Sequence, residues 1–347
     1  MILKHIKNTK DKLFIRKMQE THTLNSEFKN NIFTNFITDY NHKEIVKLIS
    51  KDFEEKLSEF KKKPKKLMIV TDFDYTLTKK YLDDNHLYSS YCVLEKSDFL
   101  SENFKIQNKN LFEKFSKYEN DISLDFNSKD KLMRQWFKEN LELILEENIN
   151  RESFLKMVLQ AEKNFYYRHG ISEFFDLIDK HNIPIIIVSG GIYEVIEESL
   201  KYVLPQYKSL KEKKLIHVVA NKFKYDENNK AIGYVEPFVY TFNKGETLKQ
   251  IFKEFSTGEE NIIVMGDHLN DIDTIKHIDY DNEIKIGFIN FEEDSLDEQK
   301  IKLLEAYQLR YDVLIFNDGN LNFVNNLVEN VLNSKDGLEL GKDEIKI

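Results

Sequence analysis

The stretch LMIVTDFDYTLT, residues 67–78, constrains the fold more than any other part of the sequence. Four apolar residues run almost directly into Asp72 and Asp74, which a single phenylalanine separates. A continuous short apolar run is typical of a strand that is covered on both faces, as in a parallel sheet. In such sheets ligands bind beyond the carboxyl ends of the strands. The two aspartates therefore follow a predicted strand at a position suited to function.

Further short apolar runs recur along the chain, and helical patterns separate most of them. The expected strands cover residues 183–191, 215–220, 261–267, 284–289 and 311–316. The expected helices cover residues 193–203, 244–255, 296–307 and 321–332. Alternating strands and helices imply a parallel sheet with helices on both faces. We therefore predict an α/β fold with a Rossmann-like parallel sheet core.

Helical patterns also precede and interrupt this alternation. Near-helical spacing of apolar residues predicts one helix over residues 41–63, which Pro64 ends. After Thr78, charged helical segments at about 109–118, 129–146 and 151–167 predict an all-helical insertion over residues 79–164. The resulting division is an N-terminal extension with a basic start (1–40), a core (41–78 and 165–335), the insertion (79–164) and a charged C-terminal tail (336–347).

Composition limits the class of protein. The chain has 347 residues, of which 41% are hydrophobic and 32% charged, with 11 Gly and 4 Pro, which is typical of a helix-rich globular protein. The formal net charge of -9 opposes a general attraction to nucleic acid, so we expect no nucleic-acid partner. The sequence does not determine the oligomeric state, and we expect a monomer or a weak homo-oligomer.

The expected location is the cytoplasm. The single cysteine, Cys92, has no partner for an internal disulfide, which fits a reducing compartment. No apolar run approaches the length of a bilayer-spanning helix, so we expect no membrane partner. The basic start MILKHIKNTKDKLFIRKMQ resembles an organellar transit peptide only in charge, because it lacks serine and has little arginine. We favour a solvated tail over a targeting segment.

Polar groups gather where the predicted strands end or a helix begins. These groups are Asp72 with Asp74, Ser189, Lys244, and Asp267 with Asp271. In a parallel sheet they would meet at one edge, where closely packed carboxylates need a cation. Oxygen-only ligands suit Mg²⁺, which usually bridges carboxylates to a phosphate. The pattern therefore predicts phosphoryl transfer with Mg²⁺ as cofactor.

Each polar group has a place in such a reaction. Asp72 can attack phosphorus to form an acyl phosphate, and Asp74 can protonate the departing oxygen and then activate water. The Ser189 hydroxyl and backbone amides near Gly190 and Gly191, at a helix N-terminus, would hold phosphoryl oxygens. A lysine at position 244 would neutralise charge between the nucleophile and the phosphate.

The motifs resemble those of a known superfamily. DFDYT (72–76), VSGG with Ser189, NK with Lys244 and GDHLND with Asp267 and Asp271 are similar, in order and spacing, to the four motifs of the haloacid dehalogenase superfamily. Longer stretches resemble the pyrimidine 5'-nucleotidase family, of the cytosolic 5'-nucleotidase III type, over roughly residues 41–332. These are TDFDYTLT, IPIIIVSGGIYEVIEE, FNKGETL, MGDHLNDI and YDVLIF. The chain departs from the family in SGG, where Ser-Ala-Gly is usual, and inside GDHLND.

The resemblance implies roles for particular residues. It implies Asp72 as nucleophile, Asp74 as acid and base, phosphate contacts at Ser189 and Lys244, and Thr76, Gly190 and Gly191 among the substrate contacts. It implies Mg²⁺ held by Asp72, the Asp74 carbonyl and Asp267, with Asp271 in support.

The resemblance also implies that the insertion is a helical cap that selects the substrate. Within it, Glu119 is similar to the family's base-reading acidic residue, and Trp136 with Phe137 to an aromatic pair. The residues alone leave other interpretations open: Glu119 as a solvated helix end, and one of the two aromatic residues as cap core.

The predicted function is Mg²⁺-dependent hydrolysis of nucleoside 5'-monophosphates, with pyrimidine bases, through an aspartyl phosphate on Asp72. The alternatives are a 7-methylguanosine monophosphate nucleotidase, a phosphoserine-type phosphatase of small metabolites, and a nucleotide-binding protein without turnover. Transfer of the phosphoryl group to a nucleoside instead of water is also compatible with these motifs.

Overall fold

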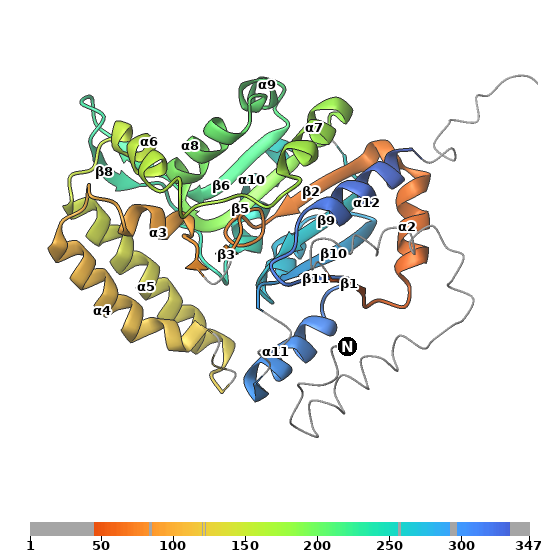
Figure 1. Cartoon of the computed structure of the whole chain (residues 1–347), viewed down its shortest axis with the longest axis horizontal. Helices are drawn as coiled ribbons and strands as arrows, with labels where there is room; N and C mark the ends of the chain where they lie inside the picture. The colour runs from red at the N-terminus through yellow and green to blue at the C-terminus, as the bar shows by residue number, and fades with distance from the viewer. Residues whose placement is uncertain are drawn as a thin grey trace, which may run out of the picture.

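A computed structural model of the chain describes residues 45–333, apart from residues 83–84, 120, 122, 256–257 and 292–296. The predicted N-terminal extension (1–40) and C-terminal tail (336–347) lie outside the described residues. The described part is built around one large sheet with helices on both faces (Figure 1).

In the described part of the chain, seven strands form the main sheet in the order β1-β11-β10-β9-β2-β5-β6. They are β1 (Ile45–Leu48), β2 (Leu67–Thr71), β5 (Ile185–Ile192), β6 (Ile216–Asn221), β9 (Asn261–Gly266), β10 (Asn282–Ile289) and β11 (Val313–Phe316). All neighbouring pairs are parallel except β1 with β11. The predicted parallel sheet is confirmed, and β2 lies between β9 and β5 near its centre.

The predicted helix over residues 41–63 is wrong in its first part. Residues 45–48 form β1, which pairs antiparallel with β11, and the helix α2 (Phe53–Lys62) follows. Val46 and Leu48 are two residues apart, so in a strand their side chains lie on the same face, and both pack partly buried against the core. The apolar residues here are therefore compatible with a strand. Pro64 ends the helical run as predicted and opens a short 3₁₀ turn, Pro64–Lys66.

Two hydrophobic cores cover the two faces of the sheet. Along β2, Ile69 contributes to one core, and Met68 and Val70 to the other. The first core is covered by α2, α7 (Ile171–His181), α8 (Tyr193–Val203) and α12 (Asn322–Leu332). The second is covered by α10 (Lys244–Phe255), η5 (Asp271–Ile275) and α11 (Glu298–Gln308). Burial on both faces explains why the central strands β2 and β9 consist almost entirely of apolar residues.

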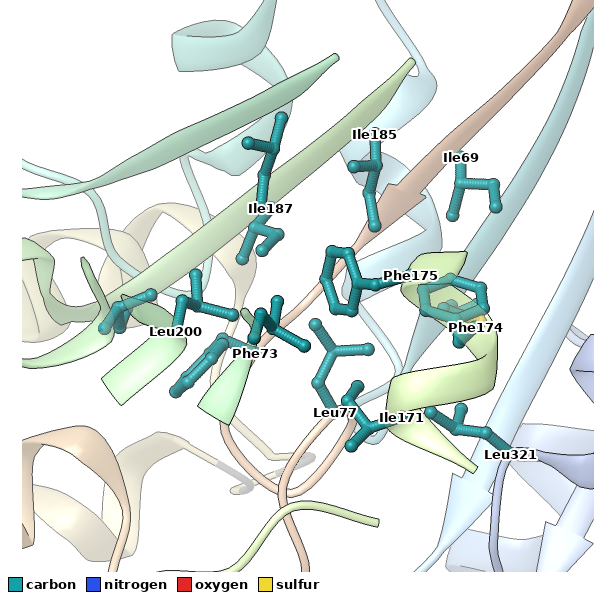
Figure 2. Close-up of a cluster of buried hydrophobic side chains, with 14 of the residues drawn as sticks. Ile69, Phe73, Leu77, Ile171, Phe174, Phe175, Ile185, Ile187, Leu200 and Leu321 are labelled. Carbon is teal, nitrogen blue, oxygen red and sulfur yellow. The ribbon is translucent and has the colours of Figure 1, made fainter. Parts of the chain in front are cut away.

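Phe73, between the two aspartates, belongs to the first core. Figure 2 shows it below the sheet, on the side where Phe174 and Phe175 of α7 face Ile185 and Ile69. Its side chain is fully buried, so it turns away from the polar edge as expected. Because neighbouring side chains in extended backbone point to opposite sides, this packing directs the flanking aspartates away from the core.

In its described residues the insertion contains four helices, but it is not all-helical. The helices are α3 (Ser90–Glu95), α4 (Glu102–Glu119), α5 (Phe126–Glu146) and α6 (Arg151–Gln160). A short strand pair, β3 (Tyr81–Leu82) with β4 (Asn85–His86), precedes them. The predicted helix over 151–167 ends at Gln160, because the chain then returns to the core and Tyr167 forms a bridge with Thr78.

Later segments add to the layer that the insertion forms. The hairpin of β7 (Phe223–Tyr225) and β8 (Ala231–Tyr234) follows β6, and β8 packs against α5. The short helix α9 (Tyr207–Glu212) lies between α8 and β6. In Figure 1, α4 and α5 lie side by side, away from the main sheet. None of the helices within the described ranges is both long enough and apolar enough to cross a membrane.

A buried arginine joins the two chain segments that connect the core with the insertion. Arg168 is 1% exposed, and its guanidinium donates hydrogen bonds to the carbonyls of Tyr75 (2.5 Å) and Thr76 (2.8 Å). It also donates to Asn290 Oδ1 at 2.8 Å and pairs with the Asp318 carboxylate at 3.1 Å. The planar guanidinium serves several acceptors at once, which lysine cannot do. Arg168 therefore holds the turn that follows Asp72 and Asp74.

We expect Arg168→Met to lower the free energy of unfolding by about 3–5 kcal/mol, because the buried Asp318 carboxylate loses its guanidinium partner and keeps the backbone N–H donors of Lys80 and Tyr81. Arg310→Met removes the half-exposed ion pair with Asp273 and should cost about 1 kcal/mol or less. Urea unfolding of both variants checks this comparison. Equal losses in the two variants would contradict the importance of the buried pair.

Candidate active site

The carboxyl ends of the strands bring the predicted polar groups together. Asp72 follows β2, Asp267 follows β9, and Lys244 opens α10. The Lys244 ammonium donates to Asp72 Oδ1 at 2.6 Å and to Asp271 Oδ1 at 2.7 Å. Carboxylate oxygens of Asp72, Asp267 and Asp271 all lie within 4.8 Å of one another. The predicted convergence at one edge of the sheet is thus present in the structure.

The Lys244 side chain is buried between two carboxylates. Burial alone would lower the pKa of Lys244, but the charges of Asp271 and Asp72 outweigh it and raise the pKa above its ordinary value. The ammonium is therefore charged at neutral pH. One buried positive charge cannot balance the two carboxylates that it contacts, and Asp267 and Asp74 add further carboxyl groups nearby.

The pKa values of two carboxyl groups, Asp72 and Asp267, are raised above the ordinary value. Burial raises the pKa of Asp72 to about 7; Lys244 opposes this shift and Asp271 adds to it. Burial, with the charges of Asp72 and Asp271, also raises the pKa of Asp267 well above its ordinary value. Both shifts mean that the folded protein without a bound cation disfavours the ionised carboxylates. A bound cation would relieve this excess of negative charge.

The donor set fits a hard divalent cation. Three carboxylates offer oxygens only, which Mg²⁺ and Ca²⁺ prefer over softer metals. Asn290 donates to Asp267 Oδ2 at 3.2 Å and so orients that carboxylate. A Cβ at position 266 would collide with the Asp271 side chain, so glycine at the end of β9 leaves room for it. Asp72, Asp267 and Asp271 are thus the residues that could hold such an ion.

Asp74 is held apart from this group. Its Oδ1 accepts a hydrogen bond from the Ser90 backbone N–H and its Oδ2 one from the Ser90 hydroxyl, each at 2.6 Å. Burial raises the pKa of Asp74 to about 6, while the two Ser90 hydrogen bonds act in the opposite direction. The Asp74 carboxylate is therefore not one of the three carboxylates that could hold a metal ion. Metal binding by the Asp74 backbone carbonyl stays a prediction.

The residues predicted to hold phosphate, 189–191, form the irregular end of β5, where its pairing with β6 shifts, and are called the phosphate turn below. A Cβ at Gly191 would lie 3.0 Å from Asp74 Oδ2, so the phosphate turn lies next to that carboxylate. The Ser189 hydroxyl accepts from the Gly191 N–H at 3.0 Å and is 1% exposed. Asn221, at the end of β6, donates to the Gly190 carbonyl at 2.8 Å and pairs with both backbone groups of Val239. Sequence reasoning missed Asn221, although a polar residue directly after the predicted strand 215–220 was the available signal. It ties the turn to the segment that leads to Lys244.

The predicted base-contacting residues of the insertion also approach this edge. Glu119 ends α4 and is not simply solvated, because the Thr241 hydroxyl donates to its carboxylate at 2.5 Å. Phe137 contacts Tyr240, and a Cβ added at Gly190 would lie 3.3 Å from the Phe137 ring. Glu119 and Phe137 thus lie against the segments that carry Lys244 and Ser189. Their contact with a base stays a prediction.

Trp136 and Thr76 are placed differently. Trp136 stacks on Phe115 with ring centroids 6.3 Å apart, so it is the aromatic residue that packs within the helices of the insertion. Its indole N–H is buried and has no hydrogen-bond partner among the described residues. The Thr76 side chain is fully buried, and its hydroxyl likewise has none there. Neither arrangement tests the predicted contact with substrate.

Comparison with known proteins agrees with this geometry. The structure superposes on the crystal structure of cytosolic 5'-nucleotidase IIIB bound to cytidine, with a TM-score of 0.69 and 23% sequence identity. The match covers 86% of this chain and 95% of that chain. The match shows that the two chains share their fold, an α/β fold with a mostly parallel central sheet.

The family is shown by the sequence comparison. The family model of the pyrimidine 5'-nucleotidases (UMPH-1) matches residues 75–332, and the chain belongs to this family. It is an enzyme of the phosphoric monoester hydrolase class, a 5'-nucleotidase. The matched region begins directly after Asp74, so the roles of Asp72 and Asp74 stay proposals.

Two curated relatives illustrate the similarity. The 7-methylguanosine phosphate-specific 5'-nucleotidase of Gallus gallus is 28% identical over 271 residues, which cover 77% of this chain and 88% of the relative. The putative cytosolic 5'-nucleotidase 3 of Caenorhabditis elegans is 28% identical over 279 residues, which cover 78% of this chain and 70% of the relative.

The raised carboxyl pKa values predict how stability depends on pH without divalent cations. Between the ordinary pKa of Asp72 and its folded value of about 7, the folded protein holds a proton that the unfolded chain has released. The free energy of unfolding should therefore fall, by about 1–3 kcal/mol, as the pH rises from about 5 to about 8 in EDTA. Denaturant titrations across this range measure the slope.

Asp72→Asn should flatten this dependence, because it removes one titrating group and the repulsion that it exerts on Asp267. Asp273→Asn serves as the control, since Asp273 lies outside the acidic group and pairs with Arg310. The expectation fails if wild type and Asp72→Asn lose stability equally between the two pH limits.

Proposed function

We propose that this chain hydrolyses nucleoside 5'-monophosphates to nucleoside and phosphate with Mg²⁺ and an aspartyl-phosphate intermediate on Asp72. The carrying observation is the buried arrangement of Asp72 beside Lys244 and within 4.8 Å of Asp267 and Asp271, with Asp74 two residues further on. This set combines a nucleophile, a fixed positive charge, a metal-ligand group and a separate carboxyl group. Phosphoryl transfer depends mainly on such positioning and charge neutralisation.

In the first step, a carboxylate oxygen of Asp72 forms a bond to phosphorus while the bond from phosphorus to the nucleoside 5'-oxygen breaks. Lys244 neutralises charge at the nucleophile, and Ser189 with the amides of the following turn contacts phosphoryl oxygens. Asp74 gives its proton to the departing 5'-oxygen. In the second step Asp74 takes a proton from water, which attacks phosphorus and releases phosphate from Asp72.

Mg²⁺ would be held by Asp72, Asp267, Asp271 and the Asp74 carbonyl, and it would neutralise charge on the phosphoryl oxygens. The support for a cation at this place is the excess of buried carboxylates over the single lysine. Asn290, which donates to Asp267, would keep that carboxylate oriented toward the ion.

For the base we propose a pyrimidine or 7-methylguanine. The family bears the pyrimidine name, the relative from Gallus gallus is named for 7-methylguanosine phosphate, and the similar solved structure is bound to cytidine. A Glu119 carboxylate accepts hydrogen bonds only, which suits the exocyclic amino groups of cytosine and 7-methylguanine. Phe137, next to Gly190, would stack on the base near the phosphate turn.

We further propose a cytoplasmic location, which agrees with the word cytosolic in the name of the Caenorhabditis elegans relative. Phosphotransfer to nucleosides and the oligomeric state, monomer or weak homo-oligomer, stay open predictions for this chain.

Purified wild-type protein should release phosphate from CMP, UMP or 7-methyl-GMP in Mg²⁺ and lose this activity in EDTA. Asp72→Asn should lower kcat by about 10³-fold or more, because an amide oxygen is a poor nucleophile at phosphorus. The measurement is phosphate release from these nucleotides and from phosphoserine. Binding of nucleotide by the inactive variant, measured by calorimetry, separates lost chemistry from lost structure.

Asp273→Asn is the matched control for this loss, because it changes an aspartate close to Asp271 but outside the acidic group. It should retain activity close to wild type. Faster release from phosphoserine than from every nucleotide would contradict the proposed substrate class, and full activity of Asp72→Asn would contradict the proposed nucleophile.

Glu119→Gln tests the choice of base. We expect kcat/KM for CMP and 7-methyl-GMP to fall by about tenfold or more, because a charged acceptor of an amino group is lost. UMP should be affected less, since uracil has no amino group. Initial rates with the three nucleotides measure these ratios.

Glu113→Gln is the control on the same helix, because Glu113 is exposed and its ion pair with Lys109, at 3.8 Å, is long. It should leave the preference among the nucleotides unchanged. A parallel loss with all three nucleotides in Glu119→Gln would show that Glu119 supports the structure rather than the choice of base.

A further inference from the structure

A serine from the insertion holds the carboxyl group proposed as acid and base. Ser90 is the first residue of α3 and fully buried. Its backbone N–H and its hydroxyl donate to the two different carboxylate oxygens of Asp74, each at 2.6 Å. Two hydrogen bonds from one residue to the two oxygens prevent rotation of the carboxyl group. Asp74 therefore has one defined orientation, and a residue outside the core sets it.

The surroundings keep Ser90 in place. Ser89, the residue before it, caps α3 by accepting a hydrogen bond from the Cys92 N–H at 3.2 Å. The helix α3 packs against β5, which ends in the phosphate turn, and against α8, which follows it. A Cβ at Gly191 would collide with the Ser90 hydroxyl and would lie 3.0 Å from Asp74 Oδ2. Glycine at this position thus permits Ser90, Asp74 and the turn to meet.

This contact matters for proton transfer. A general acid must direct one oxygen at the leaving oxygen of the substrate, and a carboxyl group that can rotate spends time in unproductive orientations. A serine hydroxyl can donate to an oxygen of the carboxyl group whether Asp74 is ionised or protonated. The Ser90 contact can therefore persist through both steps of the reaction.

We propose that Ser90 is a positioning residue for Asp74, which makes proton delivery to the leaving oxygen depend on the placement of α3 and so of the insertion. This inference rests on the proposed function, in which Asp74 protonates the nucleoside 5'-oxygen. Ser90 itself does not touch the substrate in this account and acts only through Asp74.

The leaving group provides the test. Ser90→Ala removes the hydroxyl but retains the backbone N–H. With a nucleoside 5'-monophosphate, whose 5'-oxygen must be protonated to depart, kcat/KM should fall by about tenfold. With p-nitrophenyl phosphate, whose phenolate departs without help, it should fall by less than about twofold. The comparison uses kcat/KM because this ratio reflects the steps up to the first phosphoryl transfer. Hydrolysis of the phospho-enzyme, which both substrates share, comes later and does not affect it.

Ser97→Ala is the matched control, because it removes a buried serine hydroxyl that donates to the Leu94 carbonyl near the other end of α3 and leaves Ser89, Ser90 and both bonds to Asp74 unchanged. It should change kcat/KM for the two substrates by the same factor. Ser90→Gly, which also retains the N–H, serves as a second variant should Ser90→Ala fold poorly. Thermal unfolding of each variant verifies that the compared proteins are folded.

A double-mutant cycle of Ser90 and Asp74, measured with the nucleotide alone, is a second test of whether Ser90 acts through Asp74. If Ser90 acts through Asp74, Ser90→Ala should cause no further loss in the background of Asp74→Ala. Equal losses with the two substrates, or multiplicative losses in the cycle, would overturn the proposal. Absence of phosphate release by the wild type from every nucleoside monophosphate would instead overturn the proposed function on which it rests.

Discussion

The contact of the buried Lys244 ammonium with Asp72 and Asp271 is the interaction on which the active-site edge depends. Buried carboxylates repel one another, and burial penalises each charge. One lysine at the start of α10 holds two of them close together, because its ammonium lies 2.6 Å from Asp72 Oδ1 and 2.7 Å from Asp271 Oδ1. Burial, together with the charges of Asp72 and Asp271, raises the pKa of Asp267, and the remaining excess of negative charge creates the demand for a cation. The chemistry of the site follows from this incomplete balance of charge.

Buried polar side chains keep the loops of the site in register with the rigid sheet. Arg168 ties the turn after Asp74 to the end of the sheet, and Asn221 ties the turn after Ser189 to the segment before Lys244. Ser90 adds the tie between the insertion and Asp74. Each of these side chains satisfies buried carbonyl or carboxylate groups that would otherwise be costly to leave unpaired. Loops without regular hydrogen bonds thereby acquire defined positions.

Regular elements were predictable where one local pattern admits one structure. The helices 193–203 and 244–255 occur with the predicted limits, because their apolar residues recur over about three turns. Residues 45–48 were mistaken for helix, since four residues are too few to show a period and pairing with β11 decides their conformation. The strand pair β3 and β4 is shorter still. Among the site residues, Asn221 and Ser90 escaped notice because a single polar residue at an element's end equally well suggests an ordinary cap or turn.

The sequence by itself determined the order of most strands and helices along the chain, the buried apolar strand before Asp72, and the residue types at the strand ends. These properties are local, since they depend on hydrophobic periodicity and on side-chain chemistry. Only the tertiary structure decided that Lys244 lies between Asp72 and Asp271, that Asp74 is bound by Ser90, and that Phe137 contacts the phosphate turn. Such contacts join residues far apart in the chain, and their energies depend on burial and on distances of a few ångströms, which no local pattern records.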